Sequence, residues 1–487
     1  MEVEVDVGAG IPSLTIVGLP DKAVEESKER VRLALKNSGF DFPQKKIVVN
    51  LAPASIKKEG PAYDLPIAIG ILVASGLIDE VKIQKTIFMG ELSLGGQIKV
   101  TKAIVQAASL AKAKKFKLVI PAGNLQEASL VSDIAIYAPK NLKEIYLAIT
   151  SGKSVFEISK KHGLEYSQDF ADYDFANIVG QSQAKRALEI AASGGHNILL
   201  SGSPGGGKTL LSKSIVSILP QLTEPEMLEV TKIYSVAGLL SEKLPFVQTR
   251  PFRSPHHTTS AVAVIGGGTY PKPGEVSLAH KGVLFLDEFP EFPRMVLEAL
   301  RQPLEDCVVT ISRAQGSIIY PADFILIAAQ NPCPCGYLGD EKHECTCSSS
   351  QIVAYKKRIS GPLLDRIDLH LQVEKIPLKS LKSKKKEESS LAVRGRVSAA
   401  RAIQLNRSKN ILAKLKLNSA LSKSDLEKIS ILNAECEIML EQAVDKLDLS
   451  MRSYLKIKRI ARTIADLESS SEVQVSHIVE ALQYRSK

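Results

Sequence analysis

A phosphate-binding motif is the feature of this sequence from which most of its chemistry follows. The apolar run Ile198–Leu200 precedes a complete G-x-x-x-x-G-K-T sequence. In such a motif the glycines let successive backbone N–H groups surround the β- and γ-phosphates, the lysine binds the same oxygens, and the threonine hydroxyl is a ligand for Mg²⁺. A glycine-rich surface turn is the alternative, but a strand before the loop and a helix after it favour a nucleoside triphosphate site. The residues of the motif are Gly202, Ser203, Pro204, Gly205, Gly206, Gly207, Lys208 and Thr209.

Two carboxylates follow a second apolar run and supply the partner that a phosphate loop needs. Val283–Leu286 is typical of a buried strand, and Asp287 and Glu288 come directly after it. Asp287 is suited to holding Mg²⁺ through its water shell, and Glu288 to orienting and deprotonating the water that attacks the γ-phosphate. The alternative is a pair of carboxylates that caps a helix.

A third apolar run places an amide beside the same site. Phe324–Ala329 is followed by Gln330 and Asn331, and we expect Asn331 to sense the γ-phosphate or to position the attacking water. Its alternative role is an Asx turn before Pro332. Upstream, the runs 308–312 and 317–320 flank a short glycine-containing loop, which predicts a β-hairpin with Arg313 at its tip.

Four of the six cysteines lie in one short segment, and their pairing indicates a metal site. Two C-x-C pairs are separated by nine residues, which suits a tetrathiolate zinc centre in a reducing compartment. Free buried thiols or a redox pair are the alternatives, and His343 is a possible substitute ligand. We expect the adjacent His256 and His257 to have a structural or substrate-loop role, because adjacent side chains diverge on most backbones. The expected zinc ligands are Cys333, Cys335, Cys345 and Cys347.

Length and composition describe a multidomain globular protein. The 487 residues exceed what one hydrophobic core supports, and apolar residues (44%) and charged residues (24%) are ordinary in abundance. We expect no membrane contact, since no apolar run reaches the roughly 18 residues of a membrane-spanning helix. The acidic, alternating start of the chain lacks the pattern of a signal peptide, so a cytoplasmic location is expected.

The elements that must position these residues fall into three segments. Strand-like and helical runs alternate up to about residue 160, which is typical of a compact α/β or α+β domain. The apolar runs of the middle segment predict a parallel sheet buried on both faces, and the last segment predicts an all-helical domain. The predicted parts are 1–160, a connector 161–177, an α/β core 178–378 with a cysteine-rich insert 333–347, a basic linker 379–390 and a helical domain 391–487.

The net charge of +10 is concentrated in one block. Residues 379–416 carry twelve Lys or Arg residues against two Glu residues, so the remainder of the chain is close to neutral. A solvated linker explains residues 379–390 equally well. From Arg394 onward the arginines alternate with apolar residues at helical spacing, which predicts a basic face toward a polyanion.

Several longer motifs resemble the ComM/YifB family of magnesium-chelatase-like AAA+ ATPases over nearly the whole chain. The resemblance implies a hexameric ring with active sites between subunits, ATP and Mg²⁺ as ligands and, for ComM members, a helicase activity that drives branch migration of DNA during recombination and natural transformation. The motifs are 252–257 (FRSPHH), 266–268 (GGG), 278–288 (LAHKGVLFLDE), 302–306 (QPLED), 331–336 (NPCPCG) and 361–369 (GPLLDRIDL).

The resemblance assigns three further parts of the ATP site. Arg366 resembles the arginine finger that this group supplies to a neighbouring subunit's nucleotide, with a surface ion pair to a nearby Asp as the alternative. Arg452 resembles the second sensor on the helical lid, and Arg459 competes for that role. The segment 178–181, with Val179 and Gly180, resembles the part that packs on adenine.

The hairpin tip at Arg313 and the insert at 266–268 resemble elements that this group points into the central pore of the ring. There they would hold a phosphate backbone with little base readout. The residues expected to contact DNA are Arg313, Lys281, Arg394, Arg396 and Arg401.

The stretches 59–64 (EGPAYD) and 89–97 (MGELSLGGQ) of the first domain resemble the Lon protease domain, whose fold is that of ribosomal protein S5. The family normally begins some residues before Met1, so the opening strand of this domain is expected to be incomplete. In an ungapped match Ala62 takes the place of the Lon serine and Val105 that of its lysine. Without a hydroxyl nucleophile and an amine base, peptidase activity is not expected.

These observations together predict an ATP-hydrolysing, hexameric AAA+ motor that acts on single-stranded or branched DNA. The alternative is a magnesium-chelatase-type ATPase that remodels a protein partner for metal insertion. A D-x-S-x-S pattern is absent from the sequence, which argues against the larger chelatase subunit. The basic block favours DNA over a porphyrin.

Overall fold

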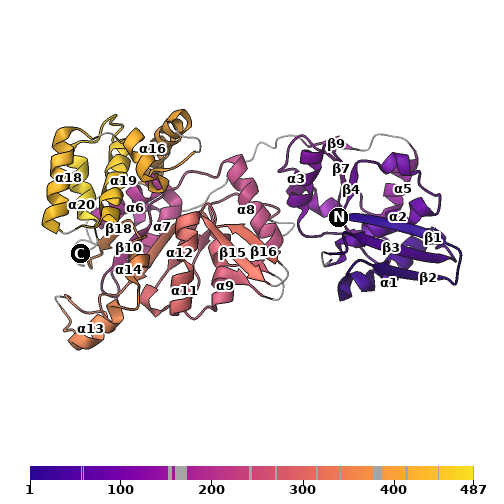
Figure 1. Ribbon diagram of the computed structural model, residues 1–487, viewed down its shortest axis with the longest axis horizontal. Coiled ribbons are helices and arrows are strands. Elements are labelled where there is room, and N and C mark those ends of the chain that lie inside the picture. Colours follow the sequence, from indigo (N-terminus) through magenta and orange to yellow (C-terminus); the bar gives the residue numbers. More distant parts are fainter. Residues whose placement is uncertain are drawn as a thin grey trace. The chain divides into compact units, whose positions relative to one another are not determined.

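The computed structural model divides into two compact units, each with its own sheets (Figure 1). The first unit comprises Met1–Tyr166 and Glu224–Gln248, and the second comprises Ser167–Thr223 and Thr249–Lys487. At residues 313 and 316 only the backbone is described. The described residues are 1–55, 58, 60–151, 156–159, 173–240, 244–268, 271–313, 316–340, 342–376, 387–411, 415–430, 432–447 and 449–485.

Two small sheets and a hairpin form the first unit. In one sheet the central strand β3 pairs antiparallel with β1 and parallel with β2, and in the other the order is β4-β7-β8-β9. The buried side chains of β3 alternate along the strand, and they pack on helices α1 and α2. The strands are β1 (Glu2–Gly8), β2 (Ser13–Val17), β3 (Lys46–Ala52), β4 (Thr86–Phe88), β5 (Glu91–Leu92), β6 (Ile98–Lys99), β7 (Lys117–Val119), β8 (Ala135–Tyr137) and β9 (Glu157–Ile158).

Helices of the first unit include one that comes from the middle of the chain. Helix α8 (Glu224–Ala237) lies within the predicted core segment 178–378, yet it groups with the first unit, where Leu228 packs on the apolar cluster that contains α3. The other helices are α1 (Lys22–Asn37), α2 (Asp64–Ala74), α3 (Ile104–Lys114), α4 (Leu125–Ala128) and α5 (Leu142–Thr150).

A five-stranded parallel sheet of order β11-β14-β17-β10-β18 organises the second unit. Its central strands are apolar throughout because both faces are covered: Val283 and Phe285 of β14 enter one apolar cluster, whereas Leu284 and Leu286 enter another. The predicted parallel P-loop core is confirmed. The strands are β10 (Ile198–Ser201), β11 (Phe252–Arg253), β14 (Val283–Leu286), β17 (Ile325–Gln330) and β18 (Leu369–Gln372).

Two hairpins extend from this core. Strands β15 (Val308–Arg313) and β16 (Gly316–Pro321) pair antiparallel, which confirms the predicted hairpin, and β12 (Gly266–Gly267) pairs with β13 (Lys272–Pro273). The helices of the core are α6 (Ser182–Gly194), α7 (Lys208–Ile218), α9 (Ala261–Ile265), α10 (Glu275–Leu278), α11 (Arg294–Ala299), α12 (Arg301–Asp306), α13 (Ser349–Lys356) and α14 (Gly361–Leu364).

The C-terminal region is helical, as predicted. Its buried residues join α6 and α7 in one apolar cluster, which also takes in the sheet face that carries Val283. None of the described helices combines the length and the apolar character that crossing a bilayer requires. The helices are α16 (Ser390–Ile411), α17 (Lys423–Ile429), α18 (Ala434–Leu447), α19 (Met451–Leu467) and α20 (Val475–Gln483).

Candidate nucleotide site

The phosphate loop joins the end of β10 to the start of α7. Gly205 and Gly207 have φ angles of +81° and +84°, a left-handed conformation that glycine adopts without steric cost. At Gly202 a Cβ would lie 2.3 Å from the carbonyl oxygen of Val373, so the segment that directly follows β18 packs against the loop. These glycines allow the backbone N–H groups at the start of α7 to face a phosphate.

Lys208 is buried within the loop that it serves. Its Nζ donates to the carbonyl oxygens of Gly202 (2.5 Å) and Ser203 (3.1 Å) and to Oδ1 of Asn331 (3.2 Å). Burial lowers the pKa of this ammonium, and the charge of Asp287 partly opposes that shift. The structure therefore brings together the loop lysine and Asn331, which are far apart in the sequence.

The two strands that flank the site also bring the predicted magnesium ligands together. Oγ1 of Thr209 donates to Oδ2 of Asp287 over 3.0 Å. A hydroxyl and a carboxylate at the N-terminus of a helix form a donor set that suits Mg²⁺ bound to triphosphate, and this ion would neutralise phosphate charge. Because β14, β17 and β10 are neighbours in one parallel sheet, their carboxyl ends place Asp287, Asn331 and the loop at one edge.

Glu288 has a partner that the sequence did not reveal. Its backbone is left-handed (φ 52°), and its Oε2 lies 3.0 Å from Nδ1 of His257. The His257 ring stacks on that of His256, with ring centroids 4.1 Å apart, and Nδ1 of His256 is 2.9 Å from Oγ1 of Thr258. The histidine pair therefore contacts the carboxylate that is the candidate general base.

The predicted adenine segment lies against the phosphate loop. Nε2 of Gln181 donates to the carbonyl oxygen of Gly206 over 3.2 Å, and the backbone N–H of Gly180 donates to Glu387 over 2.8 Å. Lys185 pairs with the same Glu387 at 2.7 Å. This segment consequently links the loop to the residues just before α16.

Arg366 lies at the opposite edge of the sheet from the phosphate loop. Its carbonyl oxygen accepts from Nδ2 of Asn197, the residue before β10, whereas the loop follows the other end of that strand. Its guanidinium is bound by Glu305 and by the carbonyl oxygen of Pro362.

A cavity of about 390 Å³ collects Arg366, Arg452 and Arg459 at this edge. Arg452 lies 3.8 Å from Asp365, and Arg459 is the more buried of the two candidate second sensors. Among the described residues, the buried Nε atoms of Arg366 and Arg459 have no hydrogen-bond acceptor. Three arginine side chains therefore line a cavity to which no residue of the phosphate loop, 202–209, contributes.

The four cysteines of the insert converge on one point. Their sulfur atoms all lie within 4.8 Å of one another, and Sγ of Cys333 is 3.4 Å from that of Cys335 and 3.7 Å from that of Cys345. All four are free thiols, as are Cys307 and Cys436. Cys436 is buried, whereas Cys307 is exposed, because it forms the left-handed end of α12 rather than part of the core.

Comparison with known families decides the assignment of this site. The magnesium chelatase, subunit ChlI, family matches residues 174–381, a family described as subunit ChlI of Mg-chelatase matches residues 3–124, and the corresponding C-terminal family matches residues 387–485. The chain is 44% identical to Competence protein ComM of Haemophilus influenzae over 99% of its own length and 94% of the relative's. It is 41% identical to YifB of Escherichia coli with the same coverage. The chain belongs to the ComM/YifB family of magnesium-chelatase-like proteins.

Membership of the ComM/YifB family makes the site that of an AAA+ ATPase, with ATP and Mg²⁺ as its ligands. The residues present fit these ligands, since the loop, Lys208, Thr209 and Asp287 are arranged as the chemistry requires.

The arginines expected to contact DNA do not form a free basic face on α16. Nε of Arg394 donates to the carbonyl oxygen of Ser217 and that of Arg401 to the carbonyl oxygen of Ala192, both over 2.8 Å. Arg396 pairs with Glu189 and Glu388. The expected orientation is thus corrected, because these side chains bind carbonyls and carboxylates of the ATPase core instead of facing solvent together.

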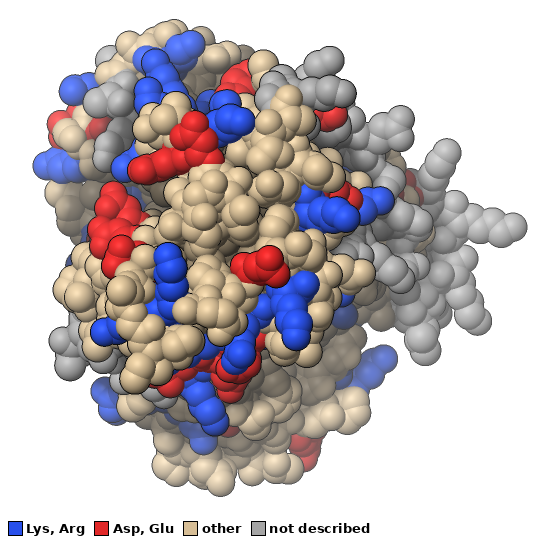
Figure 2. Space-filling view, turned by 90° about the vertical axis from the view of Figure 1, so that its right-hand side faces the viewer, with Lys and Arg blue, Asp and Glu red and all other residues tan. Residues whose placement is uncertain are grey.

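The other two candidates offer no clearer DNA surface. Lys281 pairs with Asp323 at 2.7 Å, and the side chain of Arg313 lies outside the described residues. On the face of the first unit shown in Figure 2, the described Lys and Arg residues are interspersed with Asp and Glu. Contact of these residues with DNA stays a prediction.

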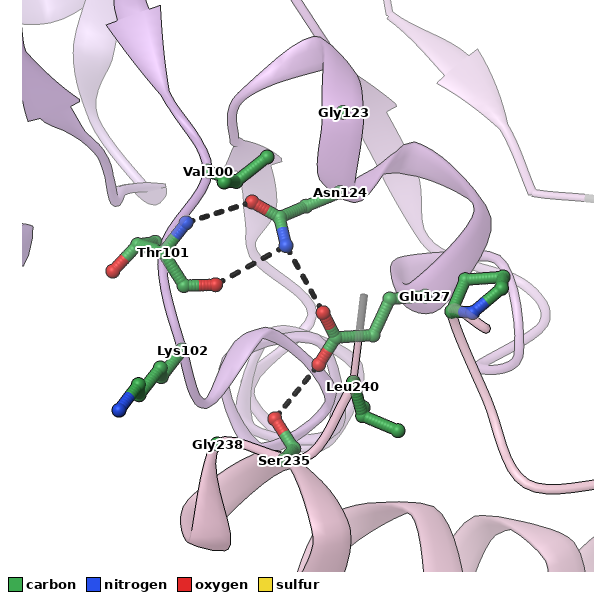
Figure 3. A pocket seen from close by; sticks show the side chains of 10 residues that line it. Val100, Thr101, Lys102, Gly123, Asn124, Glu127, Ser235, Gly238 and Leu240 are labelled. Carbon is green, nitrogen blue, oxygen red and sulfur yellow. Dashed lines mark hydrogen bonds between the residues drawn. The ribbon is translucent and has the colours of Figure 1, made fainter. Parts of the chain in front are cut away.

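The first unit of this chain has a buried carboxylate, and Ala62 and Val105 stand at the positions matched to the Lon dyad. Val105 is buried in α3 at the position of the Lon lysine, and Ala62 replaces the serine. A separate cavity of about 200 Å³ is lined by Glu127, which accepts from Ser235 (2.7 Å) and Asn124 (3.0 Å) (Figure 3). Burial raises the pKa of Glu127, and the two hydrogen bonds offset part of that shift.

Proposed function

We propose that this protein is an ATP-hydrolysing AAA+ motor that acts on single-stranded or branched DNA as a helicase in branch migration. The observation that carries the proposal is the convergence of Lys208, Thr209, Asp287 and Asn331 at one sheet edge in a chain that is related to ComM along nearly its whole length. The DNA substrate rests on the resemblance to the ComM/YifB family.

We further propose that the ATP site is completed by a second copy of the chain in a homo-hexameric ring. Within one chain Arg366 and Arg452 gather at the sheet edge away from the phosphate loop. The three arginines Arg366, Arg452 and Arg459 line one cavity there, and a group of cations suits the triphosphate of a neighbour. A finger that acts in trans makes hydrolysis depend on assembly.

The experiment that tests the DNA proposal measures ATP hydrolysis and DNA binding together. The wild type and a Glu288→Gln variant are compared with single-stranded, duplex, forked and four-way-junction DNA, with Lys208→Ala as the variant that cannot hold triphosphate. DNA is expected to accelerate hydrolysis by the wild type and to bind the ATP-trapped Glu288→Gln variant. If no DNA does either, the helicase proposal fails.

A magnesium-chelatase-type motor is the second candidate, because the matching families carry the descriptions of chelatase subunit ChlI. The same hydrolysis assay with a porphyrin-loaded partner protein separates the two. Acceleration by that partner, without acceleration by any DNA, would assign the chain to metal insertion.

A further inference from the structure

We propose that Cys333, Cys335, Cys345 and Cys347 bind one Zn²⁺ ion, and that the resulting metal knot holds the phosphate loop in place, so that nucleotide affinity depends on zinc occupancy. The proposal rests on the ATP site proposed above, but not on its action on DNA. It names a metal site and a role for it in nucleotide binding.

The spacing of the sulfur atoms fits a tetrahedral metal and excludes disulfides. A zinc ion with Zn–S bonds of about 2.3 Å places its four sulfur atoms about 3.8 Å apart. The observed separations are 3.4 Å for Cys333–Cys335, 3.6 Å for Cys335–Cys345 and 3.7 Å for Cys333–Cys345. Disulfide-bonded sulfurs would be about 2 Å apart. The backbone N–H of Cys335 also donates to Sγ of Cys347 over 3.4 Å, as second-shell donors do around zinc thiolates.

The cysteine loop packs directly on the phosphate loop. Gly336, one residue after the second cysteine, has φ +85°, and a Cβ there would lie 2.8 Å from both Cδ and Cγ of Pro204. The same Cβ would lie 3.8 Å from Cγ of Asn331, the partner of Lys208. The knot is therefore in van der Waals contact with one residue of the phosphate loop and lies beside the sensor amide.

A carboxylate lies between the cysteine loop and the phosphate loop. Asp340, between the cysteine pairs, has a carboxyl pKa lowered mainly by its hydrogen bond from Lys375, and the nearby Ser203 hydroxyl of the phosphate loop contributes to the same shift. Nζ of Lys375 binds Asp340 at 2.6 Å, and Lys375 follows β18, the strand that pairs with β10. The cysteine loop thus connects the phosphate loop to a neighbouring strand of the sheet.

The metal would fix both ends of this connection. Cys333 is two residues from Asn331, and Cys347 precedes Ser348, whose side chain caps α13 together with Gln351. Without a metal, only a few hydrogen bonds order the segment between the two cysteine pairs. A less ordered segment would no longer pack against Pro204 and Ser203 of the phosphate loop. Loss of zinc should therefore weaken nucleotide binding before it affects any step that involves DNA.

The test measures metal content and nucleotide affinity separately. Freshly purified, reduced full-length protein is analysed for zinc, and its affinity for a fluorescent ATP analogue with Mg²⁺ is measured before and after zinc removal by 1,10-phenanthroline. One zinc per chain is expected, with at least a tenfold loss of affinity on removal and recovery when zinc is restored. Absence of zinc from reduced protein would overturn the metal site.

A pair of glycine variants tests the coupling without touching a ligand. Gly336→Ala adds a methyl group that collides with Pro204, whereas Gly339→Ala adds one in the same loop, at a similar φ of +80°, with nothing within 4 Å. We expect both to retain zinc, and only Gly336→Ala to weaken analogue binding by about tenfold. Zinc-loaded Gly336→Ala with wild-type affinity would overturn the coupling, even if the zinc-free protein were to unfold. If the zinc-loaded wild-type protein did not bind the fluorescent ATP analogue, this result would instead contradict the proposed ATP site.

Discussion

Mixing two inactive variants is expected to restore ATP hydrolysis if Arg366 acts on a neighbour's nucleotide. One variant is Arg366→Ala, which keeps Glu288, and the other is Glu288→Gln, which keeps Arg366. Each is expected to bind ATP and to hydrolyse it poorly. Arg366→Ala lacks the finger, which contributes about 10³- to 10⁵-fold in related phosphate-loop enzymes, and Glu288→Gln lacks the carboxylate that activates the attacking water.

The distance between Arg366 and the phosphate loop limits the electrostatic contribution of Arg366 to ATP hydrolysis in its own chain. Arg366 is fixed by Asn197 at the start of β10, and the phosphate loop follows its end, four residues later. A strand of that length spans about 13 Å. At the effective dielectric constant of about 20 that suits charges in proteins, two unit charges at that distance interact by about 1.3 kcal/mol, which changes a rate by about tenfold. A finger effect of a thousandfold or more therefore requires a second subunit.

The amount of restored activity follows from subunit statistics. In a ring assembled at random from equal amounts, about one interface in four pairs Glu288 of one chain with Arg366 of the next, whatever the ring size. Hydrolysis near a quarter of the wild-type rate is therefore expected when interfaces act independently, with the dependence on mixing ratio as the control. A mixture no more active than the sum of its separately measured components would refute action in trans.

Three further predictions concern the carboxylates of Glu288 and Glu127 and the phosphate loop. His257→Ala should raise basal ATP hydrolysis by about fivefold and reduce further stimulation by DNA, because Glu288 loses a hydrogen bond worth about 1 kcal/mol that restrains it; unchanged basal rates would contradict this. Lys208→Ala should weaken binding of a fluorescent ATP analogue by at least about tenfold, since charge-assisted contacts to phosphate are worth about 1.5–3 kcal/mol, and calorimetry would check it. Burial raises the pKa of Glu127 in the folded chain, so the folded state binds this proton more tightly and stability should increase as pH falls through the folded pKa toward the unfolded value of about 4.3. Glu127→Gln should remove that pH dependence in urea unfolding and be the more stable form at pH 7; an unchanged pH profile would contradict it.

The nucleotide site could be predicted from the sequence because its parts follow a simple topological rule. Asp287 and Asn331 each come directly after an apolar strand, and parallel strands share a carboxyl edge. His257 could not be paired with Glu288 in the same way. It lies in a loop four residues after β11, and only the neighbouring position of β11 and β14 brings it to the carboxylate.

The basic face of α16 shows what helical periodicity leaves undetermined. The spacing of Arg394 and Arg401 places both on the helix, but it does not say whether solvent or another element lies opposite. In the structure the carbonyl oxygens of Ser217 and Ala192, near the ends of α7 and α6, accept from them. The charge pattern therefore predicted a nucleic-acid surface, whereas the structure has arginines that join α16 to α6 and α7 by hydrogen bonds.

Helix α8 has a consequence for how this protein can be divided. The chain leaves the second unit five residues after α7, the helix of the phosphate loop, and returns three residues before β11. On α8, Ser235 accepts from the backbone of Ala103 and donates to Glu127, and the carbonyl oxygen of Lys232 accepts from Gln106. A gene fragment that begins at residue 173 would therefore encode α8 without Ala103, Gln106 and Glu127, the residues to which this helix is hydrogen-bonded. The N-terminal region is not a detachable module, and its gain or loss during evolution would have required rebuilding the loop between the phosphate-binding helix and the next strand.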